Sequence, residues 1–143
     1  MTKTELLRRW YDEVWENGNL DVIDDFFDPE TVAAGIVPEM QMGRDDFKAL
    51  VMAFQSHVGT FKIDLLKVIE SGDWLAAIIR VSTTRSDNGA PIEVTGQTMT
   101  RFKGDKMVEA YNQMDYITLL EQLELLPADT LPICMTGQRL DWT

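Results

Sequence analysis

Three long segments of alternating apolar and polar residues dominate the second half of the chain and constrain its fold most strongly. They span residues 74–86, 91–103 and 106–114, and Asp87-Asn88-Gly89 separates the first two. A two-residue period places successive side chains on opposite faces of a sheet, and Asn-Gly is a strong hairpin signal. Alternation also begins at Phe61, so the sequence predicts an antiparallel meander of four strands.

The first half of the chain shows helical periodicity instead. Apolar residues of segment 6–15 recur on one face of a predicted helix, Thr2 and Glu5 have the spacing of a capping box, and Gly18 supplies a stop. The other expected elements are a short helix over 20–27, a strand over 31–37, a helix over 44–57 and a short helix over 116–123.

This order of elements predicts an α+β fold, because all the long helices precede the meander and must pack on one face of it. We expect a cone-shaped, strongly curved, mostly antiparallel sheet, with three N-terminal helices packed on its concave face and a short C-terminal helix. The alternation slips at Leu65-Leu66, which indicates a bulge that bends the strand. Residues 1–126 would form this domain and 127–143 an irregular tail, and the mouth of the cone would hold a ligand.

Charge and composition narrow the classes of partner. The formal net charge of the 143 residues is -11, and the basic residues do not cluster, which disfavours nucleic acid and anionic membranes as partners. Cys134 is the single cysteine, the N-terminus has no apolar signal-peptide core, and no apolar run approaches the roughly 20 residues of a membrane span. We therefore expect a cytoplasmic protein without disulfides.

Four stretches together resemble the SnoaL-like polyketide cyclases of the nuclear-transport-factor-2-like superfamily. They are YDEVWENGNLDVIDDFFDPE (11–30), GRDDFKALVMAF (43–54), VIESGDWLAAIIRVSTT (68–84) and VTGQTMTRFKGDKMVEAYNQMDYITLLEQL (94–123). The resemblance implies the cone fold. It also implies an aspartate at the end of the last long strand that acts as general acid/base in an intramolecular aldol ring closure, without metal or cofactor. Asp115 occupies that position here.

Two interpretations of Asp115 remain open from the sequence. An acid/base next to a carbonyl substrate needs a pKa raised toward neutrality, which apolar surroundings provide by desolvation. Alternatively, Asp115 caps the helix that begins at Tyr116, and the backbone N–H groups would then lower its pKa.

The other candidate residues would bind the substrate. Asn112 and Gln113 are neighbours on one strand, so only one of them can face the pocket; strict alternation favours Gln113, and a bulge would favour Asn112. Either amide could stabilise an enolate oxygen. His57, the only histidine, is expected at a helix end, and no zinc site is predicted. The remaining predicted substrate-binding residues are Tyr11, Trp15, Phe54, Gln97, Thr98 and Tyr111.

Two functions of different classes follow from these observations. The first is a cofactor-independent enzyme, a cyclase, isomerase or lyase, that acts on a hydrophobic carbonyl compound in the cone pocket. The second is a non-catalytic ligand-binding or dimerisation module of the same fold. We also expect a homodimer through the sheet face, because Ile78, Ile79 and Val81 leave apolar side chains on both of its faces.

Overall fold

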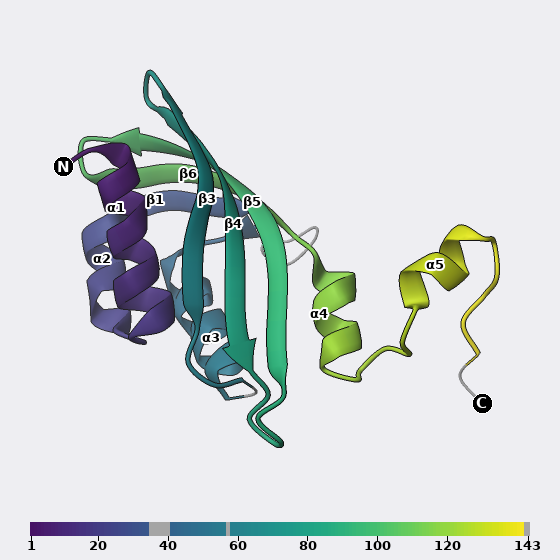
Figure 1. The fold of residues 1–143 in the computed structure, drawn as a ribbon. Coiled ribbons are helices and arrows are strands. Elements are labelled where there is room, and N and C mark those ends of the chain that lie inside the picture. The colour runs from purple at the N-terminus through teal and green to yellow at the C-terminus, as the bar shows by residue number, and fades with distance from the viewer. Residues whose placement is uncertain (35–40, 57, 142–143) are drawn as a thin grey trace.

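A mixed β-sheet with helices packed against it forms the body of the protein in the computed structural model (Figure 1). The structure describes residues 1–34, 41–56 and 58–141. The helical elements are α1 (Lys3–Trp10), η1 (Tyr11–Glu16), η2 (Leu20–Val22), α2 (Ile23–Phe26), α3 (Arg44–Gln55), α4 (Tyr116–Gln122) and α5 (Thr130–Met135). The strands are β1 (Phe27–Ala34), β2 (Gln41–Met42), β3 (Lys62–Ser71), β4 (Trp74–Thr84), β5 (Pro91–Lys103) and β6 (Lys106–Met114).

The sheet has the strand order β2-β1-β6-β5-β4-β3 and is open at both edges. The predicted meander is confirmed, since β3 to β6 pair consecutively and antiparallel. β1 adds a parallel pair with β6, which makes the sheet mixed. The bulge predicted at Leu65-Leu66 is confirmed by the register shift between Leu65 and Lys67.

The first helix has the predicted cap and an unexpected end. The side chain of Thr2 accepts from the backbone N–H of Glu5, and the side chain of Glu5 accepts from the backbone N–H of Thr2. After Trp10 the chain continues as the π-helix η1. Gly18 then stops it in the left-handed conformation, with φ of 67°, as predicted. A π-helical segment rotates the side chains that follow it, and such segments are frequent at functional sites.

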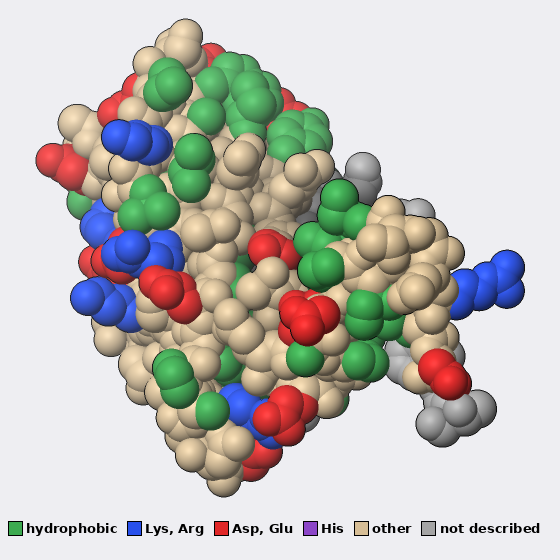
Figure 2. Space-filling view, turned by 45° about the vertical axis from the view of Figure 1, so that its right-hand side comes forward, with side chains coloured by type: hydrophobic (Ala, Val, Ile, Leu, Met, Phe, Trp, Pro, Cys, Tyr) green, Lys and Arg blue, Asp and Glu red, His purple; other side chains and the backbone are tan. Residues whose placement is uncertain are grey.

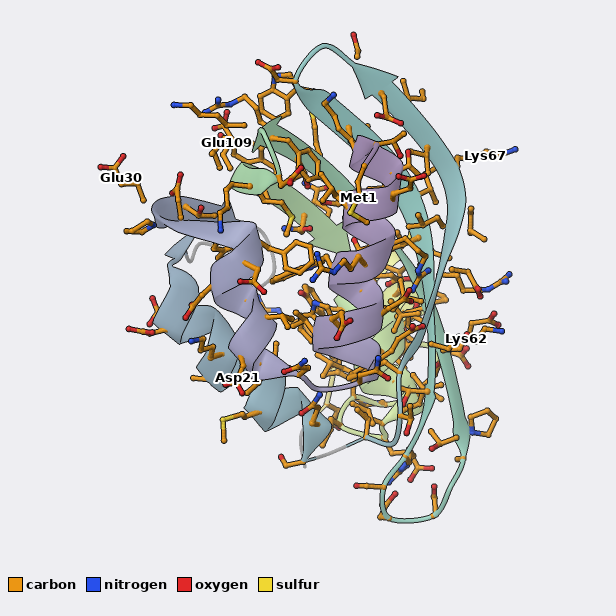
Figure 3. The ribbon with its side chains drawn as sticks, turned by 90° about the vertical axis from the view of Figure 1, so that its left-hand side faces the viewer. Met1, Asp21, Glu30, Lys62, Lys67 and Glu109 are labelled. Carbon is orange, nitrogen blue, oxygen red and sulfur yellow. The ribbon has the colours of Figure 1, made fainter. Side chains whose placement is uncertain are left out.

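The hydrophobic core lies between this helix and one sheet face, called the inner face here. Leu7 and Val14 of the helix and Leu75 of β4 are completely or almost completely buried. The Trp10 ring stacks on Phe27 with 5.0 Å between centroids. Lys62 and Lys67 of β3 point away from the helices, on the opposite outer face (Figure 3). The two-residue period therefore separates core from surface as expected.

Helix α4 lies beside β5, beyond the point where β6 ends. β6 ends opposite Gly96, so the part of β5 before Gly96 has no β6 partner. The side chain of Gln122 takes the place of a strand partner there. Its oxygen accepts from the Glu93 N–H (2.9 Å), and its NH₂ donates to the Glu93 carbonyl (3.1 Å). A side-chain amide thus replaces the missing ladder bonds of a central strand.

The irregular tail predicted for 127–143 is wrong over Thr130–Met135, which forms α5. Pro132 is compatible with this helix because it falls in the first turn, where the N–H has no intrahelical partner and proline is tolerated. α5 contacts α4 and extends away from the sheet (Figure 1).

Candidate functional site: a cavity between the sheet and two helices

A cavity of about 540 Å³ lies against the inner face of the sheet. Its floor comes from β4, β5 and β6, one wall from α1 and η1, and another from α4 and the residues that follow it. The lining is predominantly apolar, and the volume lies within the usual range for small-molecule sites. Leucines of the α4 wall contribute much of the apolar surface: Leu119, Leu120, Leu123 and Leu125.

A cluster of uncharged polar side chains lies deep in this cavity. Tyr11 shares a hydrogen bond with the Thr98 side chain, and the Thr98 and Thr100 hydroxyls are 3.1 Å apart. Asn112 stands directly opposite Thr98 in the β5–β6 register and lines the same cavity. These four side chains form the deep polar cluster, which can present hydroxyl and amide donors to a ligand oxygen.

Tyr11 is the titratable member of the deep polar cluster. Burial raises the pKa of its phenol well above the ordinary value, and Arg8 and the Thr98 hydrogen bond offset only part of that effect. The phenol is therefore protonated throughout the physiological pH range and acts as a hydrogen-bond donor, not as a base. At the α4 wall, burial raises the pKa of Tyr116 to about 12.

Charged side chains gather at the other end of the cavity, on the β4–β5 hairpin. Arg85 and Asp87 both line it, and Asp87 accepts from Nε (2.9 Å) and Nη2 (2.6 Å) of Arg85. Glu124, which follows α4, lies 3.4 Å from Nη1 of the same guanidinium. The hydrogen bonds from Arg85 hold the pKa of the Asp87 carboxyl below its usual range, which makes Asp87 a weak base.

Asp115 directly follows the last residue of β6, at the predicted position, but its carboxylate is engaged as the cap of α4. Its oxygens accept from the Thr118 N–H (3.1 Å) and from the Thr118 hydroxyl (2.6 Å). The residue is exposed and is not one of the described residues that line the cavity. The geometry is thus that of the capping alternative, while the predicted acid/base role stays a prediction.

Three of the predicted substrate-binding residues lie on the outer face of the sheet. Tyr111 stacks on Trp74 and donates to Glu109, whereas Gln97 and Gln113 line a separate outer depression of about 260 Å³. The correction for Gln113 has a physical reason. The pairing passes from Phe102–Met107 to Arg101–Glu109, so a bulge in β6 turns Asn112 inward instead.

The structure brings four predicted site residues together at the cavity. They are Tyr11, Trp15, Thr98 and Asn112. The side chain of Phe54 and the whole of His57 lie outside the described residues.

Sequence reasoning missed Thr83, Arg85, Thr100 and the leucines of α4. Side chains two residues apart on a strand share a face. Thr83 and Arg85 therefore follow Ile79 on the inner face, and Thr100 follows Thr98 there. That pattern could have found all three, whereas the wall formed by α4 depends on how the helix docks.

Neither a candidate metal site nor a membrane-spanning helix is found in the described ranges. No group of three or more His, Cys, Asp or Glu side chains could hold a metal ion among these residues. No helix there is long and apolar enough to cross a membrane.

Comparisons with solved structures place this architecture in a well-populated class. IdmH of Streptomyces antibioticus, a proposed polyketide cyclase, superposes with a TM-score of 0.77 at 19% identity, over 87% of this chain and 99% of that chain. AclR of Streptomyces galilaeus, a proposed hydroxylase, superposes with a TM-score of 0.74 at 16% identity, over 95% of this chain and 91% of that chain. A Catenulispora acidiphila protein with a ketosteroid isomerase-like fold superposes with a TM-score of 0.75 at 18% identity, over 92% of this chain and 100% of that chain. At these identities the likeness establishes the fold, not the reaction.

The mixed sheet with its packed helices is an α+β fold of the nuclear-transport-factor-2-like kind, with an apolar cavity against its inner face. The family model of SnoaL-like polyketide cyclases matches residues 5–123, so this chain belongs to that family. No curated protein sequence matches it.

Proposed function

We propose that the protein is a cofactor-independent cyclase or isomerase that binds a hydrophobic carbonyl compound in the cavity, at the mouth of a cone-shaped sheet. One observation carries this proposal: an apolar cavity of about 540 Å³ has a deep cluster of neutral hydrogen-bonding groups at Tyr11, Thr98, Thr100 and Asn112. An apolar lining with a few convergent polar groups is the usual design of a ligand site.

The deep polar cluster would polarise the substrate carbonyl. A phenol that stays protonated donates a hydrogen bond to an oxygen on which negative charge develops, and it does so in a region shielded from water. The neighbouring Asn112 amide could donate a second hydrogen bond. Proton transfer at the adjacent carbon would then fall to a carboxylate, for which Asp115 is the residue predicted by family resemblance.

A specific observation favours the alternative of a ligand-binding module without chemistry. Asp115 is engaged with Thr118, and Asp87, a carboxylate among the described lining residues, is a weak base because of Arg85. A site with carbonyl-binding donors and no strong base would bind a ketone without turning it over.

Proton exchange at the carbon next to a carbonyl tests both functions without knowledge of the substrate. We would incubate 2-decalone with the protein in D₂O and follow loss of the α-proton signals by NMR. We expect the protein to accelerate exchange, and Tyr11→Phe to reduce that acceleration about 100-fold, as loss of an oxyanion donor does elsewhere. Asp115→Asn should abolish it.

Tyr111→Phe is the matched control, because that phenol lies on the outer face and should leave exchange unchanged. Quenching of the cavity tryptophans would report binding separately. A ketone that binds but exchanges at the spontaneous rate would overturn the enzyme and support the binding module.

A further inference from the structure

A second pair of polar side chains lines the cavity at the end opposite the deep polar cluster. Among the described residues, the buried side-chain polar atoms without a hydrogen bond are Thr83 Oγ1 and Arg85 Nη1, and both residues line the cavity. Thr83 is only 8% exposed. Glu124 pairs with Arg85 Nη1 by charge at 3.4 Å but accepts no hydrogen bond from it. A buried donor without a hydrogen bond is costly, so Thr83 Oγ1 and Arg85 Nη1 at one place favour a ligand oxygen there.

The guanidinium of Arg85 is already oriented for this role. Nε and Nη2 of Arg85 both donate to the carboxylate of Asp87. The remaining nitrogen, Nη1, makes no hydrogen bond and lies 3.4 Å from the Glu124 carboxylate. The hydroxyl of Thr83 is shielded, so another part of that side chain faces the cavity. A rotation about χ1 between staggered positions exchanges its methyl and hydroxyl groups and presents the donor without backbone movement.

The local charges decide which oxygen fits. Arg85 carries one positive charge, and the carboxylates of Asp87 and Glu124 carry two negative charges beside it. A further anion would be repelled by this net negative charge, and the chain as a whole carries -11. An uncharged acceptor avoids that repulsion and still gains a hydrogen bond from a charged donor.

We propose that Thr83 and Arg85 form a second anchor, which binds an uncharged carbonyl oxygen of a ketone, ester or amide. This deepens the proposed function, since it rests on a first carbonyl bound at the deep polar cluster. Thr98 pairs with Ala77, and Thr83 lies six residue steps further along β4, which is about 20 Å along an extended strand. The preferred substrate is therefore elongated, with an apolar middle and neutral oxygen functions at both ends.

Matched linear ketones test the second anchor. We would titrate the protein with methyl ketones and with the corresponding terminal diketones, over a range of chain lengths, and follow tryptophan fluorescence. The diketone should bind more tightly than the monoketone of equal length, with an optimum at one length. Thr83→Val should weaken the best diketone about 3- to 10-fold, the effect of one hydrogen bond, and leave the monoketone unchanged.

Further variants separate this inference from the proposed function. Arg85→Lys should also remove the diketone advantage, because lysine lacks the planar fork. Thr84→Val, one residue further on the exposed face, should change neither affinity. Monoketone binding without any diketone advantage or effect of Thr83→Val would overturn the second anchor alone. Failure of both ketone classes to bind would overturn the proposed function as well.

Discussion

Single residues of this protein illustrate how one position can suit two roles. Asp115 lies where the family resemblance implies an acid/base, yet both oxygens of its carboxylate contact Thr118. Tyr11, in contrast, is predicted from the sequence only as a substrate-binding residue, and in the structure it is the buried phenol of the deep polar cluster. The difference arises because burial of Tyr11 depends on the helix packing against the sheet, whereas the cap of α4 depends only on neighbouring residues.

The capping role of Asp115 leads to a prediction about stability. Asp115→Ala removes the cap of α4 and should lower the free energy of unfolding by about 1 kcal/mol. Asp115→Asn should cost only a few tenths of that, because asparagine caps equally well. Urea denaturation followed by circular dichroism measures both. Equal stability of the alanine and asparagine variants would show that the cap contributes nothing in solution.

At the scale of elements, α4 decides whether the cavity is closed on one side. It supplies Tyr116, Leu119 and Leu120 to the wall, and the side chain of its last residue, Gln122, makes two hydrogen bonds with the backbone of Glu93. Arg85 and Glu124 add an ion pair beyond the helix end. Because none of the residues of α4 is fully buried, these few polar contacts matter more for its position than they would for a core helix.

Replacing Gln122 should therefore loosen α4. Gln122→Met keeps the length and helix propensity of the side chain but removes both hydrogen bonds to Glu93. We expect the Glu93 amide to exchange with solvent deuterium about tenfold faster, which corresponds to the loss of about one hydrogen bond. Gln113→Met on the outer face is the matched control. Unaltered protection of Glu93 in the Gln122 variant would contradict this account of the wall.

The whole molecule leaves two apolar regions in contact with solvent. Figure 2 shows hydrophobic side chains on the sheet and again on the segment of α4 and α5. Exposed members on the outer sheet face are Ile69, Ile78, Met99 and Tyr111, and those on the second segment are Leu125, Leu131 and Met135. Contiguous apolar patches commonly mark association surfaces.

The sheet face remains our predicted dimer interface. Met99→Asp would place a charge in the middle of that face and should convert a dimer into a monomer, as measured by light scattering coupled to size-exclusion chromatography. Met135→Asp on α5 tests the other region and should leave the dimer intact. A wild-type monomer, or dissociation by the α5 variant alone, would refute association through the sheet.

The sequence alone determined the α+β class, the order of the main helices and strands apart from β2 and α5, the capping box and the bulge at Leu65, since each depends on local periodicity or turn chemistry. Tertiary structure decided which face each strand residue occupies. One extra residue in β6 reverses the alternation, so Asn112 reaches the cavity while Tyr111 and Gln113 do not. The walls of the cavity likewise required the docking of α1, η1 and α4. Pairing register and helix docking depend on contacts between residues far apart in the chain, and no local pattern encodes them.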